Sequence, residues 1–171
     1  MRLPIRAFLT AAVASVTLLG GRADAQTASP QISRRSEPKT AFAVSDFTKL
    51  KWLEGSWAGT SPDQRPIYAR YRFSSDSTID ITYYGDANFG RESGTGRVYL
   101  SVGRVYYTYG PGRWGASRVS DDVIFLVPQV NAQNTFGWKR VSADSWTSTM
   151  RSGVSGHDRV IVYQMQRVSP R

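Results

Sequence analysis

The sequence predicts an all-β fold: an antiparallel up-and-down barrel of about ten strands, with one short N-terminal helix closing an end. From Gly55 onward, short segments rich in Tyr, Val, Ile, Thr and Trp alternate with Gly, Asp, Ser and Asn. Most connections have two to four residues, which is too short for the crossovers that parallel strands require. Within the segments apolar and polar residues alternate, as they do in strands with one buried face.

The expected strands are 55–61, 66–74, 78–84, 93–101, 104–110, 113–119, 122–128, 134–142, 144–151 and 158–168. In the second of these, Ile67, Tyr71 and Phe73 share one face, and Arg70 and Arg72 share the other. One buried face per strand favours a closed barrel, which has no exposed edges. A two-sheet sandwich is the alternative, although Greek-key sandwiches usually have longer connections.

The predicted helix spans Ser45 to Leu53. Ser45 can cap it, and Phe47, Leu50 and Leu53 fall on one face. Gly55 then ends the helix and opens the first strand.

Residues 1–25 have the parts of a secretory signal peptide. Arg2 and Arg6 precede an apolar run over 7–19, and Ala23-Asp24-Ala25 forms a cleavage site. The run is shorter than the roughly 20 residues of a spanning helix, so we expect cleavage after Ala25 and a periplasmic or secreted protein. An N-terminal anchor left in place is the alternative.

The rest of the chain divides into a polar leader and one domain. Residues 26–43 are rich in Ser, Thr, Gln and Pro, a composition that cannot bury enough surface to order the chain. Residues 44–171 form the expected barrel domain. The chain has no cysteine, so its core must hold the exported fold without disulfides.

The chain is basic, with 22 Lys and Arg against 13 Asp and Glu and a net charge of +9. Basic chains can bind nucleic acid or anionic membranes. Here the charges are scattered singly along the strands, and no nucleic-acid motif is present. We therefore expect solvated surface charge and no nucleic-acid partner, with an anionic component of the cell envelope as the alternative partner.

The segment LKWLEGSWAG at 50–59 carries the most specific motif, formed by Gly55, Trp57 and Gly59. It resembles the opening strand of calycin-type barrels, which include lipocalins, fatty-acid-binding proteins and nitrobindins. It is also similar to uncharacterised exported bacterial families that begin W-L-x-G-x-W. The resemblance implies that Arg167, on the last strand, packs across Trp57 and that Trp57 plugs one end of the barrel. Ligand contact by Trp57 is the alternative.

His157 is the only histidine, and a single histidine cannot build a zinc site. The nitrobindin resemblance implies a haem-binding histidine on the final strand. In this chain His157 falls in an expected turn before that strand, and 160–166 contains no histidine. We therefore expect no cofactor and no metal, with His157 a solvated turn residue.

No catalytic residues emerge from the sequence. A G-x-S-x-G elbow is missing, and Gly94-Thr95-Gly96 lacks the strand-to-helix context of a phosphate loop. Asp121-Asp122 fits a solvated turn. Enzyme activity stays open, with an isomerase or cyclase inside the barrel as the third hypothesis.

The aromatic residues give the remaining clue, since the chain has nine Tyr, seven Phe and five Trp. Tyrosine combines an apolar body with a hydroxyl and so suits a pocket for an amphiphilic ligand, although aromatics also pack strands. The candidate ligand-binding residues are Tyr71, Tyr83, Tyr107, Tyr109 and Trp138. The leading hypothesis is a monomeric barrel that binds a small hydrophobic or amphiphilic molecule, and the second is an envelope-binding or structural protein with a basic surface.

Overall fold

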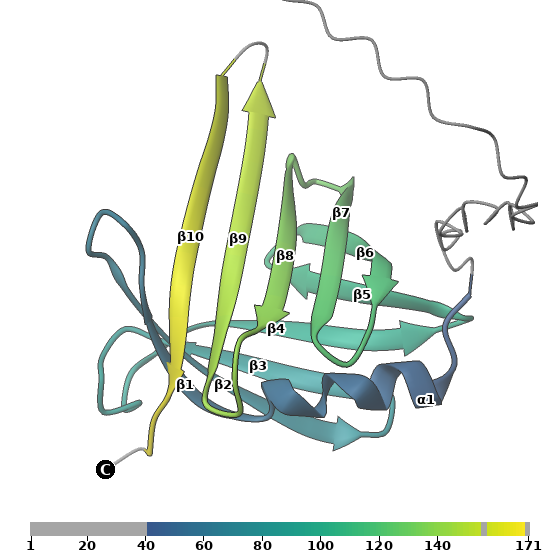
Figure 1. The fold of residues 1–171 in the computed structure, drawn as a ribbon, viewed down its shortest axis with the longest axis horizontal. Coiled ribbons are helices and arrows are strands. Elements are labelled where there is room, and N and C mark those ends of the chain that lie inside the picture. The colour runs from purple at the N-terminus through teal and green to yellow at the C-terminus, as the bar shows by residue number, and fades with distance from the viewer. Residues whose placement is uncertain (1–40, 155–156, 170–171) are drawn as a thin grey trace, which may run out of the picture. The chain divides into compact units, whose positions relative to one another are not determined.

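The computed structural model describes residues 41–154 and 157–169. The predicted signal peptide and most of the predicted leader lie outside these residues. The described part forms a closed barrel of ten antiparallel strands, each paired with its neighbours in chain order, and β1 pairs with β10 to close it (Figure 1). The predicted fold class is confirmed, and the sandwich is excluded.

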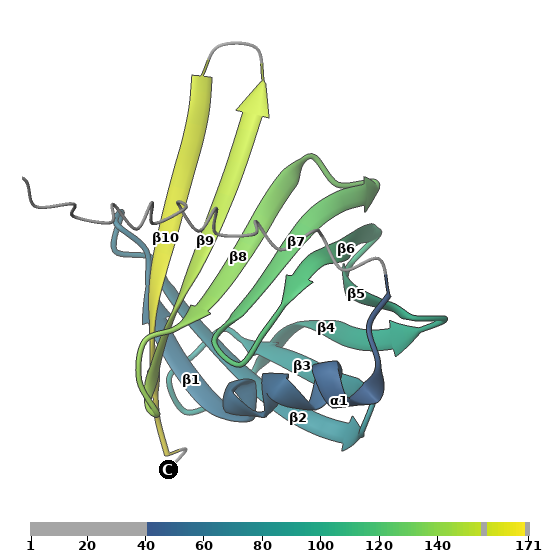
Figure 2. The ribbon, with the colours of Figure 1, turned by 45° about the vertical axis from the view of Figure 1, so that its right-hand side comes forward.

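The strand bounds lie within a few residues of the expected ones. They are β1 Gly55–Thr60, β2 Pro66–Ser75, β3 Thr78–Tyr84, β4 Glu92–Ser101, β5 Arg104–Tyr109, β6 Gly112–Val119, β7 Val123–Val130, β8 Asn134–Arg140, β9 Ser145–Val154 and β10 His157–Arg167. The largest difference is at the end of β9, which continues to Val154 because it pairs with β10 along its whole length. The β9–β10 hairpin extends beyond the other strands (Figures 1 and 2).

The helical segment consists of α1 Val44–Phe47 followed at once by the 3-10 helix η1 Thr48–Leu53. Its N-cap is Ala43 and not the predicted Ser45, and the backbone N–H of Ala43 donates to Asp46 Oδ2 at 2.9 Å. Phe47, Leu50 and Leu53 are fully buried, as their common face predicts. No helix in the described ranges is long and apolar enough to cross a membrane.

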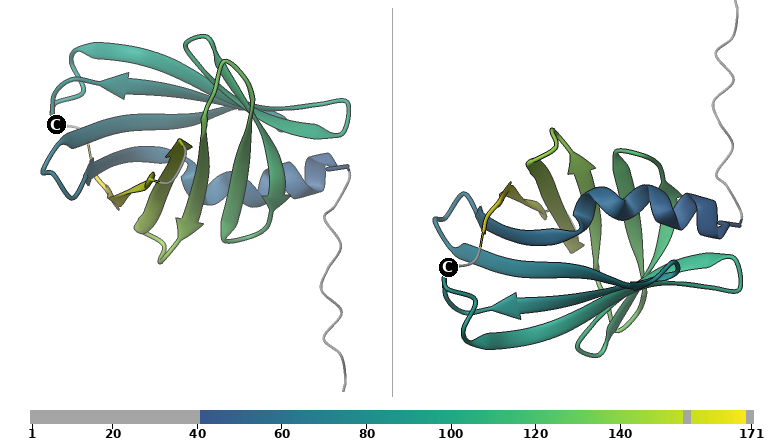
Figure 3. Two further views of the ribbon diagram at one scale, coloured as in Figure 1. Left: turned by 90° about the horizontal axis from the view of Figure 1, so that it is seen from above. Right: turned by 90° about the horizontal axis from the view of Figure 1, so that it is seen from below.

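The helical segment runs across the end of the barrel opposite the β9–β10 tip (Figures 1 and 2). Seen along the barrel from below, it lies in front of the strands (Figure 3). Just before it, Phe42 is 7% exposed, and its N–H donates to the carbonyl oxygen of Gly103 at 2.7 Å. This contact fixes the start of the helical segment against the β4–β5 turn.

The core fills the barrel next to the helical segment. Alternate residues of neighbouring strands point inward there and are almost completely buried: Ala69, Ile79, Ile81, Val98, Val105, Ile124 and Leu126. Arg72 and Arg97 are on the outer face, where Arg97 Nε lies 2.7 Å from Asp80 Oδ1. The predicted alternation on β2, β3 and β4 is therefore present.

Candidate ligand-binding site

The barrel contains a cavity of about 330 Å³. Its wall includes all five ligand-binding residues expected from the sequence: Tyr71, Tyr83, Tyr107, Tyr109 and Trp138. These side chains come from β2, β3, β5 and β8. The fold thus brings residues from distant parts of the chain into one wall.

Two glycines of β4 make room for the tyrosines. A Cβ at Gly96 would lie 3.2 Å from Tyr107 Cε2 and 3.5 Å from Tyr83 Cε2, and one at Gly94 would lie 3.1 Å from the Tyr109 hydroxyl oxygen. β4 lies between β3 and β5. Because it has no side chain at Gly94 and Gly96, the tyrosine rings of β3 and β5 can pack against its backbone there. Gly94 and Gly96 therefore leave the space in which the wall tyrosines pack.

The hydroxyl groups of Tyr83 and Tyr107 are hydrogen bonded at 2.8 Å. Burial raises the pKa of Tyr83 to about 12. Burial, followed by charge repulsion from Tyr83, also raises the pKa values of Tyr71 and Tyr107 well above the ordinary value. All three phenols therefore stay protonated and uncharged at neutral pH.

Tyr109 is the part of the predicted site that reaches the protein surface. Its ring centroid lies 5.1 Å from that of Tyr83 in an edge-to-face arrangement, and the residue is 44% exposed. A molecule entering beside Tyr109 would meet the paired hydroxyls next.

Trp146 connects the cavity wall to the packed core. Its ring centroid lies 5.8 Å from that of Tyr71, and 5.9 Å from those of both Trp57 and Trp138. Its indole N–H is buried and has no hydrogen-bond partner in the structure. This leaves a buried donor on a residue of the wall.

The wall carries no ionisable side chain other than tyrosine among the residues that the structure describes. Within the same residues, no three His, Cys, Asp or Glu side chains gather as metal ligands would. The arrangement can bind an apolar or aromatic molecule and offer it hydroxyl groups.

The four motif residues Gly55, Trp57, Gly59 and Arg167 are not among the residues of the cavity wall. Gly55 begins β1 at its helical end, and Gly59 lies near the other end of the strand. Trp57 is 1% exposed, and its indole N–H donates to the Leu53 carbonyl oxygen at 2.7 Å. The Arg167 guanidinium carbon lies 4.3 Å from the centroid of the Trp57 ring, which is the cation–π contact implied by the calycin resemblance.

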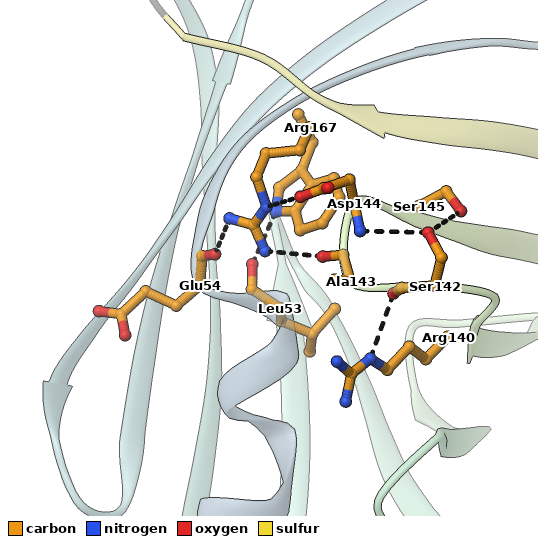
Figure 4. Close-up of polar contacts among 9 residues, drawn as sticks. Leu53, Glu54, Arg140, Ser142, Ala143, Asp144, Ser145 and Arg167 are labelled. Atoms are coloured by element: carbon orange, nitrogen blue, oxygen red, sulfur yellow. Dashed lines mark hydrogen bonds and ion pairs between the residues drawn. The ribbon is translucent and has the colours of Figure 1, made fainter.

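Three hydrogen bonds orient the Arg167 guanidinium (Figure 4). It donates to the Glu54 carbonyl oxygen at 2.7 Å, to Asp144 Oδ1 at 3.1 Å and to the Ala143 carbonyl oxygen at 3.3 Å. Arg167 therefore joins β10 to the end of η1 and to the β8–β9 turn.

Both glycines of the motif are required by close neighbours. Gly55 has a φ of +126°, and a Cβ there would lie 2.3 Å from Arg167 Nη1. A Cβ at Gly59 would lie 2.3 Å from Met165 Sδ and 3.0 Å from Ile67 Cγ2. The spacing of the motif thus places Trp57 between two points at which other side chains cross β1.

His157 is not in the turn expected from the sequence, because it is the first residue of β10 and its backbone pairs with Val154. The turn prediction failed because the β9–β10 ladder extends further than the residue pattern indicates. Asp121 and Asp122 do lie in the connection between β6 and β7, where the Ser120 hydroxyl donates to Asp122 Oδ1 at 2.7 Å.

Part of the wall was not predicted from the sequence. The missed residues are Pro66, Ile67, Tyr68, Tyr84, Ser93, Phe136, Trp146, Ser148, Met150, Tyr163 and Met165. On β9 the inward residues Trp146, Ser148 and Met150 alternate with threonines, so the two faces differ little in polarity. The one signal in the sequence was that these residues occur at every second position. It was weak, because a buried strand face is normally recognised by being more apolar than the opposite face.

No family model matches this chain, and no curated protein sequence matches it. Among solved structures, a redesigned β-barrel is similar with 16% identity and a TM-score of 0.36, covering 76% of this chain and 98% of the other. The structure of EF1p2_mFAP2b bound to DFHBI is similar with 14% identity and a TM-score of 0.34, covering 71% and 98%. Similarities of this size say nothing about what this chain binds.

Proposed function

We propose that this chain is a monomeric binding protein that holds a small hydrophobic or amphiphilic molecule inside its barrel. The observation that carries the proposal is the cavity of about 330 Å³ with a largely aromatic wall. Small-molecule sites are typically concave, of about 300–1,000 Å³, and mostly apolar with a few placed polar groups. The paired hydroxyls of Tyr83 and Tyr107 supply such groups.

We also propose that the protein is exported and that its barrel is of the calycin type. The support is the signal-peptide pattern of residues 1–25 and the Gly55-Trp57-Gly59 motif with Arg167 stacked on Trp57. Sequencing the N-terminus of protein from a periplasmic or culture fraction tests export. Gln26 is the expected first residue, and an intact Met1 in a membrane fraction would contradict it.

Uptake of a neutral fluorescent probe, N-phenyl-1-naphthylamine, tests the binding function. We expect saturable binding to the wild-type protein and its loss in Ser148→Trp, because Ser148 lines the cavity and an indole would fill it. Thr149→Trp is the matched control, since it adds the same group to the neighbouring residue of β9, which is not among the wall residues. Native mass spectrometry of the freshly purified protein would then reveal a bound natural ligand.

The basic surface motivates a second candidate, an envelope-binding protein. Arg72, Arg97 and Arg104 are exposed on the outside of the barrel, and the whole chain has a charge of +9. Salt-sensitive binding to anionic vesicles without uptake of the neutral probe would favour this candidate over the container.

A further inference from the structure

We propose that the cavity selects an uncharged aromatic or conjugated molecule of about two rings that carries a hydrogen-bond acceptor, such as a ketone oxygen, and that it rejects a carboxylate of the same size. This inference rests on the proposed function and names the ligand class for the same site. Three properties of the wall carry it: its charge, its hydrogen-bond donors and its size.

The wall offers nothing to balance a buried negative charge. Its described residues include no Arg, Lys or His. Arg97 is paired with Asp80 and Arg167 with Asp144, and Arg70 is not a wall residue: its Nε donates to Ser56 Oγ and its guanidinium carbon lies 5.5 Å from the centroid of the Tyr84 ring. Moving a carboxylate from water into an apolar site without a partner charge is strongly unfavourable. A fatty-acid or aromatic carboxylate therefore fits this wall poorly.

The wall does offer donors to a neutral ligand. Each phenol has one proton. The Tyr83 hydroxyl is hydrogen bonded to those of Tyr107 and Tyr71, so three phenols share two hydrogen bonds and one O–H stays available. An unpaired buried donor is costly, and a ligand acceptor that reaches it removes this cost.

The cavity volume limits the ligand size. At about 330 Å³, it lies near the lower end of the range for small-molecule sites. The rings of Tyr107, Trp138 and Phe136 form edge-to-face contacts around it, and a flat ring system can extend this arrangement. A compact aromatic molecule therefore suits the site better than a long flexible chain.

Three naphthalenes of nearly equal size separate these properties. They are 2-acetylnaphthalene, which has a neutral acceptor, 2-ethylnaphthalene, which has none, and 2-naphthoate, which is anionic at neutral pH. Binding is measured by titration calorimetry on the mature protein, which is the chain after cleavage of the predicted signal peptide. We expect the ketone to bind about 2- to 12-fold more tightly than the ethyl compound, which is the effect of one hydrogen bond, and the naphthoate to bind at least about 100-fold more weakly than the ketone.

The double variant Tyr83→Phe/Tyr107→Phe removes both hydroxyls and keeps both rings. It should reduce the preference for the ketone over the ethyl compound, since of the three buried phenols only Tyr71 remains in the wall, and leave binding of the ethyl compound within about twofold. Outward-facing Tyr99→Phe is the matched control and should preserve the preference. Circular dichroism verifies that each variant is folded.

The outcomes separate this inference from the proposed function. Binding of 2-naphthoate as tight as that of the ketone, or a ketone preference that is unchanged in the double variant, would overturn the ligand class and leave the binding function standing. Failure of all three naphthalenes and of N-phenyl-1-naphthylamine would overturn both.

Discussion

Trp57 and Arg167 are the two side chains on which the closure of the barrel depends most directly. Trp57 lies on β1 and Arg167 on β10, and these residues are also paired across the ladder that closes the sheet. The stacked guanidinium and the indole hydrogen bond to Leu53 hold the end of η1 in the same place. A single residue pair thus joins the first strand, the last strand and the helical segment.

Replacing Trp57 with Ala should lower the free energy of unfolding by about 3–5 kcal/mol, the usual effect of removing a large buried aromatic side chain. Chemical denaturation followed by circular dichroism measures the change. Trp57→Phe is the control for ring burial, because it keeps an aromatic group but loses the hydrogen bond to Leu53. A denaturation midpoint for the Ala variant equal to that of the wild type would remove Trp57 from its structural role.

At the scale of elements, glycines decide which side chains can cross a strand. On β1, Gly55 admits the guanidinium of Arg167, and on β4, Gly96 admits the rings of Tyr83 and Tyr107. In both strands the absence of a Cβ atom leaves space that a side chain from a neighbouring strand occupies. Conservative Gly→Ala changes therefore test the packing between elements.

Gly55→Ala should lower the free energy of unfolding by about 1–3 kcal/mol, because alanine is strained at positive φ and its Cβ would meet Arg167 Nη1. Part of this loss should disappear in the Arg167→Gln background, with a coupling of at least about 0.5 kcal/mol. Gly110→Ala is the control, since Gly110 has a φ of +53° but nothing within 4 Å of its Cβ position. Strict additivity of the two changes would show that Gly55 does not serve the Arg167 contact.

Gly96→Ala should weaken probe binding about 3- to 10-fold, an amount of the order of one lost hydrogen bond. The new methyl group would lie 2.9 Å from the backbone carbonyl oxygen of Thr108 and 3.2 Å from Tyr107 Cε2, so β4 and the Tyr107 ring have to move apart. Gly137→Ala is the matched control on β8, where a Cβ would lie 3.4 Å from Phe125 in an ordinary contact. Fluorescence titration with N-phenyl-1-naphthylamine compares the two variants. Equal affinities would contradict the role assigned to Gly96.

At the scale of the whole molecule, the buried phenols make the folded state sensitive to alkali. The unfolded chain releases tyrosine protons near pH 10, whereas Tyr83 in the folded barrel keeps its proton to about pH 12. Between these values the unfolded state binds fewer protons, so the free energy of unfolding falls as the pH rises. Below about pH 10 this contribution is fully present.

We expect Tyr83 alone to remove on the order of 3 kcal/mol of stability between about pH 10 and pH 12. Urea denaturation at a series of pH values measures the slope. Tyr83→Phe has no proton to release at this position, and its stability should fall less steeply over the same interval. Parallel profiles for the two proteins would contradict the coupling between this phenol and folding.

The sequence predicted the barrel well because its strands are short, regularly spaced and mostly amphipathic. Alternation also grouped Tyr71 with Ile67 and Phe73 on one face of β2, but it did not tell which face of the strand is inside the barrel. It could not place the Tyr83 and Tyr107 hydroxyls next to each other, since their distance depends on how β3 and β5 pair with β4 and on the register shift next to Tyr83. The sequence did not predict that Trp146 lines the cavity, because the residues that flank it on both faces of β9 are Ser and Thr and so do not indicate which face is buried.

The network of ring contacts also gives the molecule an optical property. All five tryptophans belong to one chain of neighbouring rings: Trp52, Trp57 and Trp138 each adjoin Trp146, and Trp138 adjoins Tyr107, which adjoins Trp114. Light absorbed by one indole can pass to the others over such short separations. Because Trp138 and Trp146 belong both to this network and to the cavity wall, a quenching guest in the cavity should lower the emission of the other indoles as well.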